Sequence, residues 1–156
     1  MPATARSSMT MTPVVPVART GVVGRRTSTS ALNGAKGLVD LGRVLLAIPF
    51  VELGRLVQGP SWLISRVRSR GHLARERSPT ERQALRRLIA AVDARLPGGG
   101  NCYRRALVEM ALDPSAAEER LFLGLKAHGG PRSGHAWLSS WPDTANAGAY
   151  DAVLEM

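Results

Sequence analysis

The sequence predicts an α+β fold in which helices come first and a small antiparallel sheet comes last. Apolar residues recur at helical spacing as far as residue 112 and alternate with other residues after residue 120. Asp113-Pro114 is a stop signal between the two patterns, and Trp141-Pro142 is a turn signal within the second. A chain of 156 residues with 44% apolar residues is long enough for one domain with its own core.

Composition divides the chain into three parts. Residues 1–33 are rich in Thr, Ser, Pro and Ala, have no period, and carry four arginines and no acid, so they predict a disordered basic tail. We expect N-terminal helices over 34–77 and a core over 78–156, with 34–156 forming one domain. The apolar run at 44–51 is far shorter than the roughly 20 residues of a membrane span, so no span is predicted.

Two or three short helices are predicted before residue 77. The first is an amphipathic helix indicated by apolar residues at helical spacing, Leu38, Leu41, Leu45 and Ile48. We expect Pro49 to end or kink this helix and a second short helix to follow over 51–57. A further helix is predicted over 61–70, with Trp62 and Ile64 as its apolar contacts.

The next two helices have clear start signals. Ser78-Pro79-Thr80-Glu81 is a capping box with Pro at the first helical position. It precedes an apolar stripe of Leu85, Leu88, Ile89, Val92 and Leu96. Pro97 and three glycines stop that helix. Asn101 is then a preferred N-cap, which places Cys102 on the first turn of a helix that runs to about residue 112.

Three strands are predicted after that helix. Alternation over 121–126 and over 135–141 indicates two of them, and 150–154 indicates a third. A Gly/Pro loop over 128–134 separates the first two. We expect the second and third strands to form a hairpin that turns near Asp143.

Cys102 is the only cysteine, so an internal disulfide framework and a Cys-rich zinc site are excluded. A free thiol favours a reducing, cytoplasmic location. At a helix N-terminus, next to Arg104 and Arg105, the thiolate form is stabilised, which suits a nucleophile. The alternative is a small buried core residue, which is the commoner role of a lone cysteine.

His135 is the candidate general base because it opens a strand after a flexible loop and can face a helix end. His72 and His128 have no obvious partner. Asp151 is the candidate group to orient the imidazole, since a hairpin turning at Asp143 would pair residues whose numbers add to about 286 and so place Asp151 beside His135. Asp143 itself lies in the turn and is the other choice.

The charge balance suits an acidic partner. The formal net charge is +9, and 19 of the 21 basic residues are arginines. Nucleic-acid binding is not predicted, because the possible stacking residues Trp137, Trp141 and Tyr150 lie in the part after residue 119, which carries no net charge.

Three segments in this order resemble the lasso peptide biosynthesis B2 proteins. They are Asn101-Cys102-Tyr103-Arg104-Arg105-Ala106-Leu107, Leu121-Phe122-Leu123-Gly124-Leu125-Lys126 and Gly134-His135-Ala136-Trp137-Leu138. These proteins are leader peptidases related to the C-terminal domain of the microcin J25-processing protein, within the transglutaminase-like superfamily. The resemblance covers about residues 95–156 and extends more weakly to 38–49.

The resemblance implies a papain-like core with the cysteine at a helix N-terminus packed on a small antiparallel sheet. Cys102 would attack a peptide carbonyl, His135 would carry the proton and Asp151 would hold the imidazole. The substrate would be the leader of a ribosomally made precursor, and the partners would be a separate leader-binding protein and an ATP-dependent lasso cyclase. No cofactor or metal is implied.

The chain departs from the family pattern at two places. The family places its acid nearer the histidine, whereas the stretch 141–149 is longer here, and Tyr103 stands where Leu is more common. Two other hypotheses stay open. One is a transglutaminase-like amidase or acyltransferase that acts on another substrate, and the other is a non-catalytic basic binding module in which Cys102 is simply buried.

Overall fold

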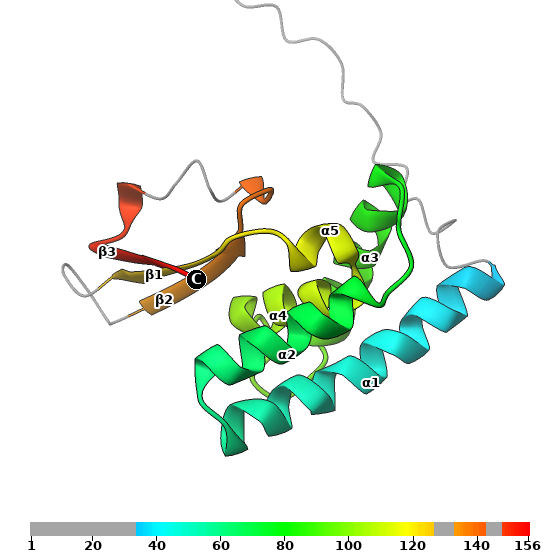
Figure 1. Cartoon of the computed structure of the whole chain (residues 1–156), viewed down its shortest axis with the longest axis horizontal. Coiled ribbons are helices and arrows are strands. Elements are labelled where there is room, and N and C mark those ends of the chain that lie inside the picture. Colours follow the sequence, from blue (N-terminus) through cyan, green and yellow to red (C-terminus); the bar gives the residue numbers. More distant parts are fainter. Residues whose placement is uncertain (1–33, 127–132, 143–147) are drawn as a thin grey trace, which may run out of the picture.

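The protein's structure is a computed structural model that describes residues 34–126, 133–142 and 148–156. In these ranges five helices precede three strands, which confirms the α+β class (Figure 1). The helices are α1 (Ala35–Val57), α2 (Pro60–His72), α3 (Pro79–Asp93), α4 (Cys102–Leu112) and α5 (Pro114–Ala117). The strands are β1 (Leu121–Lys126), β2 (Ser133–Leu138) and β3 (Ala152–Glu155). The tail predicted over 1–33 and most of the loop predicted over 128–134 lie outside the described residues.

Helix α4 is the centre of the fold. Every residue from Arg104 to Leu112 except Arg105 is buried, because α1, α2, α3 and the sheet all pack around it. The helices lie together on one side and the sheet projects from them on the other (Figure 1). Predicted inward residues Ala106, Leu107 and Met110 are all fully buried. Cys102 therefore starts a helix whose position is set from all sides.

Pro49 was predicted to end or kink the first helix, with a second short helix following over 51–57. Pro49 does not end the helix, since α1 is one element that contains Pro49 and continues to Val57. Pro49 lies on the exposed side, where the Leu45 carbonyl that loses its amide partner can meet water. The buried face of α1 is Val44, Ala47, Ile48, Val51 and Gly54. Leu38 and Leu45, expected to face the core, are exposed instead. Among the described residues, no helix has both the length and the apolar character needed to cross a membrane.

Helix α2 packs on α4 at very close range. Its buried residues are Leu63, Ile64, Val67 and Gly71, whereas Trp62, expected in the core, is 42% exposed. A Cβ atom on Gly71 would overlap the carbonyl oxygen of Met110 and lie 2.7 Å from the Cβ of Ala117. Glycine is thus required where the two helices cross.

Helix α3 begins at the predicted capping box. The Ser78 hydroxyl accepts from the Glu81 N–H, and the Glu81 carboxylate accepts from the Ser78 N–H. That backbone hydrogen bond from Ser78 and the guanidinium of Arg75 lower the pKa of Glu81 to about 2. Leu85 and Ile89 of the predicted stripe are fully buried, and Leu88, Val92 and Leu96 pack against the core.

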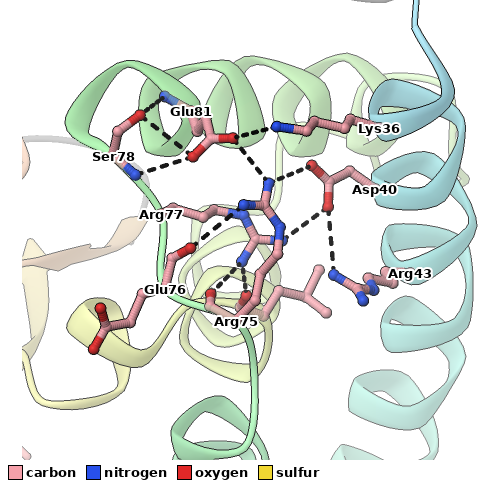
Figure 2. A network of polar contacts seen from close by, with 9 residues as sticks. Lys36, Asp40, Arg43, Arg75, Glu76, Arg77, Ser78 and Glu81 are labelled. Atoms are coloured by element: carbon pink, nitrogen blue, oxygen red, sulfur yellow. Dashed lines mark hydrogen bonds and ion pairs between the residues drawn. The ribbon is translucent and has the colours of Figure 1, made fainter.

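A polar network ties α1 to the segment that precedes α3 (Figure 2). The buried Arg77 side chain donates to Asp40 Oδ1 at 2.8 Å and also to the carbonyl of Leu112 at the end of α4. Arg75 lies 3.2 Å from Glu81 and 4.0 Å from Asp40. Three helices are therefore held together at this end by one guanidinium that is shielded from solvent.

A second buried carboxylate connects α4 to α3 and to the end of β2. Glu109 accepts from Arg86 Nε at 2.6 Å and from the Trp141 indole at 3.1 Å. Burial raises the pKa of Glu109, and the hydrogen bond from Arg86 opposes that effect. The arginines of α3 that the sequence places outside the apolar stripe thus face carboxylates of α4 as well as solvent.

The sheet has the order β2-β1-β3, and both neighbours are antiparallel to the central strand. Leu121 of β1 pairs with Leu138 of β2, and Leu123 pairs with Leu154 of β3. The predicted hairpin between β2 and β3 is therefore wrong. The physical reason for this difference is that the outer edge of β2 faces the N-terminus of α4. Strand β3 therefore pairs with the free edge of β1 instead.

Candidate active site

Cys102 is the first residue of α4, as predicted. The Asn101 side chain accepts from the Arg104 N–H at 3.0 Å and so caps the helix. The thiol is half-buried and accepts a hydrogen bond from the Ala136 N–H, with 3.2 Å between nitrogen and Sγ. The open edge of β2 thus directs a backbone donor at the sulfur, and the positive end of α4 lies on its other side. Both groups stabilise negative charge on Sγ.

The Cys102 thiol meets β2 at Ala136, and His135 is the residue before Ala136 in that strand. Successive residues of a strand face opposite sides of a sheet. Ala136 and Leu138 face the core, and His135 shares the other face with Trp137. The His135 ring stacks on Trp137 with centroids 5.6 Å apart and on Tyr150 with centroids 6.2 Å apart. Its plane is thereby restrained.

One open cavity of about 350 Å³ contains both candidate groups. Cys102 and His135 line it together with Asn101, Tyr103, Pro60 and residues of the β1–β2 pair, namely Leu123, Gly124, Leu125, Gly134 and Ala136. Most of this lining is apolar or backbone. The cavity is therefore suited to an extended, uncharged segment that passes the sulfur.

His72 lies away from this cavity. His72 ends α2 and lines a separate cavity with Arg68 and Met156. His128 is outside the described residues. His135 is thus the histidine that the described structure places in one cavity with the thiol.

The two arginines expected to stabilise the thiolate are turned toward carboxylates. Arg104 is 5% exposed, and its Nε donates to Asp93 Oδ1 at 2.5 Å. The same guanidinium contacts Glu52 at 3.2 Å and the Gly98 carbonyl at 3.3 Å. Arg105 Nε lies 3.9 Å from Asp93 Oδ2. These ion pairs fix the first turn of α4, and their charges are compensated there.

The register that placed Asp151 beside His135 is wrong. Gly124 of β1 is the residue opposite His135, and Val153 of β3 is opposite Gly124 on the other side. Asp151 is exposed and precedes β3, where its N–H donates to the Leu125 carbonyl at 3.0 Å. The central strand therefore lies between the backbones of the two residues. Asp143 lies outside the described residues, so the choice between the two acids stays a prediction.

Sequence reasoning missed the roles of two residues next to His135, which are Gly124 and Tyr150. A Cβ atom on Gly124 would lie 2.6 Å from Tyr150 Cγ and 2.9 Å from the Trp137 ring. The absence of a side chain at Gly124 is what allows the Tyr150 ring to cross β1 and reach His135. The available signal was a glycine in the middle of a predicted strand, which often marks a close approach by another group.

Within the described ranges, no group of three or more His, Cys, Asp or Glu side chains could hold a metal ion. The chain matches no protein-family model, no curated protein and no solved structure. The family suggested by its sequence thus rests on the resemblance alone, and any chemistry must be argued from Cys102 and His135.

Proposed function

We propose that the protein is a transglutaminase-like cysteine peptidase that removes the leader from a ribosomally made precursor during lasso peptide maturation. The observation that carries this proposal is the Cys102 thiol at a helix N-terminus, with the N–H that follows His135 donating to it. Its cavity is shared with His135. The three sequence segments that resemble the leader peptidases are the second support.

In the proposed reaction, Cys102 Sγ attacks the carbonyl carbon of the scissile amide, and His135 accepts the thiol proton. The C–N bond then breaks as His135 returns the proton to the leaving nitrogen. Water, deprotonated by His135, hydrolyses the resulting thioester and frees the thiol. The Cys102 N–H at the helix N-terminus is the expected donor to the oxyanion. No metal or cofactor takes part in these steps.

A substrate of this kind suits the cavity because its lining is largely apolar and open. Recognition of the leader would come from a separate leader-binding protein, and the cleaved core would pass to an ATP-dependent lasso cyclase. The competing function is amide hydrolysis or acyl transfer on another substrate, which would require the same two residues.

The test is the rate of Cys102 alkylation by iodoacetamide as a function of pH, in the wild type and in His135→Ala. We expect the wild-type thiol to be alkylated faster than the His135→Ala thiol, because the variant lacks the imidazole that accepts the thiol proton. His72→Ala is the matched control, because it removes a histidine from a different cavity. Unchanged profiles in all three proteins would overturn the Cys–His pair and favour a binding module.

Cleavage of a candidate precursor then separates the peptidase from the other enzyme classes. Cys102→Ala and His135→Ala should both abolish cleavage. Asp151→Asn and Asp143→Asn should differ, and the variant with the larger loss identifies the orienting acid. A reactive thiol that cleaves no leader peptide would favour the amidase or acyltransferase.

A further inference from the structure

Helix α1 has a second apolar face that the described residues leave uncovered. Its residues form one strip, here called the apolar strip: Leu38, Val39, Gly42, Leu45, Leu46, Pro49, Leu53, Leu56 and Val57. The leucines and valines of this strip are 52–84% exposed. With 3.6 residues per turn, the strip occupies a sector of about 120° roughly opposite the buried face. A helix that is apolar all round is normally covered on all sides.

The charges along one edge of the apolar strip are cationic. None of the five charged residues of α1 falls within the strip. On one flank lie Arg43 and Arg70, whose guanidinium covers the Phe50 ring at 5.4 Å. On the other side of the strip lies Glu52, which pairs with Arg55 at 3.1 Å, so this edge carries no net charge.

The two acids of α1 contribute little negative charge at this surface. Asp40 has only 17% of its side chain exposed and pairs with Arg77 at 2.8 Å. Glu52 accepts from Arg55 at 3.1 Å and from the buried Arg104 at 3.2 Å. The surface therefore consists of an apolar centre with one positive edge, at Arg43 and Arg70.

We propose that the apolar strip docks the protein onto an anionic lipid bilayer. An interfacial helix buries an apolar face about 5–10 Å into the headgroup region and holds basic residues at the phosphates. The arrangement on α1 provides both features. The helix also lies at the outer edge of the helical layer, away from the sheet (Figure 1), so a flat surface can reach it.

A second copy of the chain fits this surface less well. A two-fold interface would bring the same cationic edge of both copies close together. A lipid surface needs no matching partner shape.

Docking would also position the candidate active site. The strip ends at Val57, and three residues later Pro60 begins α2 and lines the Cys102 cavity. A bound molecule would hold that cavity close to the bilayer surface. This docking does not depend on the proposed peptidase activity.

Flotation of the full chain with vesicles tests the proposal. One set contains phosphatidylcholine only, and the other also contains phosphatidylglycerol. We expect binding to the second set, weakened about tenfold or more by Leu53→Glu, which places a charge in the strip. Leu154→Glu is the matched control, since Leu154 is 56% exposed, close to the 63% of Leu53, but lies on β3. Arg43→Gln with Arg70→Gln should weaken binding about fivefold or more for each charge removed.

Three results would overturn the proposal. The first is no flotation with either vesicle set. The second is equal flotation of the wild type and Leu53→Glu, which would assign binding to the basic residues 1–33 that all variants share. The third is a dimer by sedimentation velocity that Leu53→Glu dissociates without any vesicle binding, which would make a second copy the occupant. Leu46→Glu serves as an independent strip variant, and circular dichroism checks that each variant folds.

Discussion

Asp93→Asn should destabilise the protein strongly, because it removes the charge that compensates a buried guanidinium. Asp93 is 1% exposed and Arg104 is 5% exposed, and they are joined by the 2.5 Å hydrogen bond at the first turn of α4. Removing one partner of a buried pair destabilises by about 3–5 kcal/mol. Glu52 remains 3.2 Å from Arg104 in the variant, so we expect the lower end, about 3 kcal/mol.

The assay is urea unfolding followed by circular dichroism. With a slope of about 2 kcal/mol per molar, the midpoint should fall by roughly 1.5 M while the slope stays unchanged. Arg104→Met and the double variant complete a cycle, and the double variant should be more stable than the sum of the single losses implies. The reasoning is refuted if Asp93→Asn shifts the midpoint by less than about 0.3 M, or if the two single losses simply add.

Three further changes test other parts of the structure. Gly71→Ala should lower stability by about 3 kcal/mol in thermal unfolding, whereas Gly42→Ala, which has open space, should not lower it. Gly124→Ala should displace the tyrosine ring from His135, which would be seen as a changed near-ultraviolet dichroism spectrum. Glu81 has a folded-state pKa of about 2, below its ordinary 4.5, so its stabilising effect is complete above pH 4.5 and disappears as the pH falls toward 2. The stability difference between the wild type and Glu81→Gln should shrink over that range, and a constant difference would contradict this sign.

Local signals predicted most of the secondary structure. Start and stop residues act within one helical turn, so the capping box at Ser78 and the N-cap at Asn101 mark α3 and α4 correctly. Strand β1 matches its predicted range because alternation is also a local property. The short helix α5 was missed, since four residues carry too little periodic signal.

The errors arose where distant segments decide the outcome. Helix α1 is apolar on two faces, so the spacing of Leu38 and Leu45 could not show which face meets α4. Nothing near Pro49 indicates that packing on α4 would hold the helix together through it. The order of the strands depends on α4 occupying the edge of β2, a contact between Cys102 and Ala136 that spans 34 residues.

The first two members of the candidate site were predicted from local patterns, and the third from a strand register. Cys102 and His135 each follow from a local pattern, a helix start and a strand start, and the structure places them in one cavity. The position assigned to Asp151 depended on a hairpin register that the strand order β2-β1-β3 contradicts, so the choice between Asp151 and Asp143 stays a prediction. Tyr150 reaches His135 only because Gly124 has no side chain, which is a three-body arrangement across the sheet.

The central position of α4 has a consequence for how the chain is made. The inner face of α1 needs α4 as its cover, and 55 residues separate the ends of these helices at Val57 and Leu112. A ribosome that adds about 5–20 residues per second takes roughly 3–11 s over that distance. During this time the apolar strip and much of the inner face of α1 lack their cover, so we expect chaperones to bind the nascent chain. A lower growth temperature or co-expression of chaperones should therefore raise the yield of folded protein more than substitutions in the sheet would.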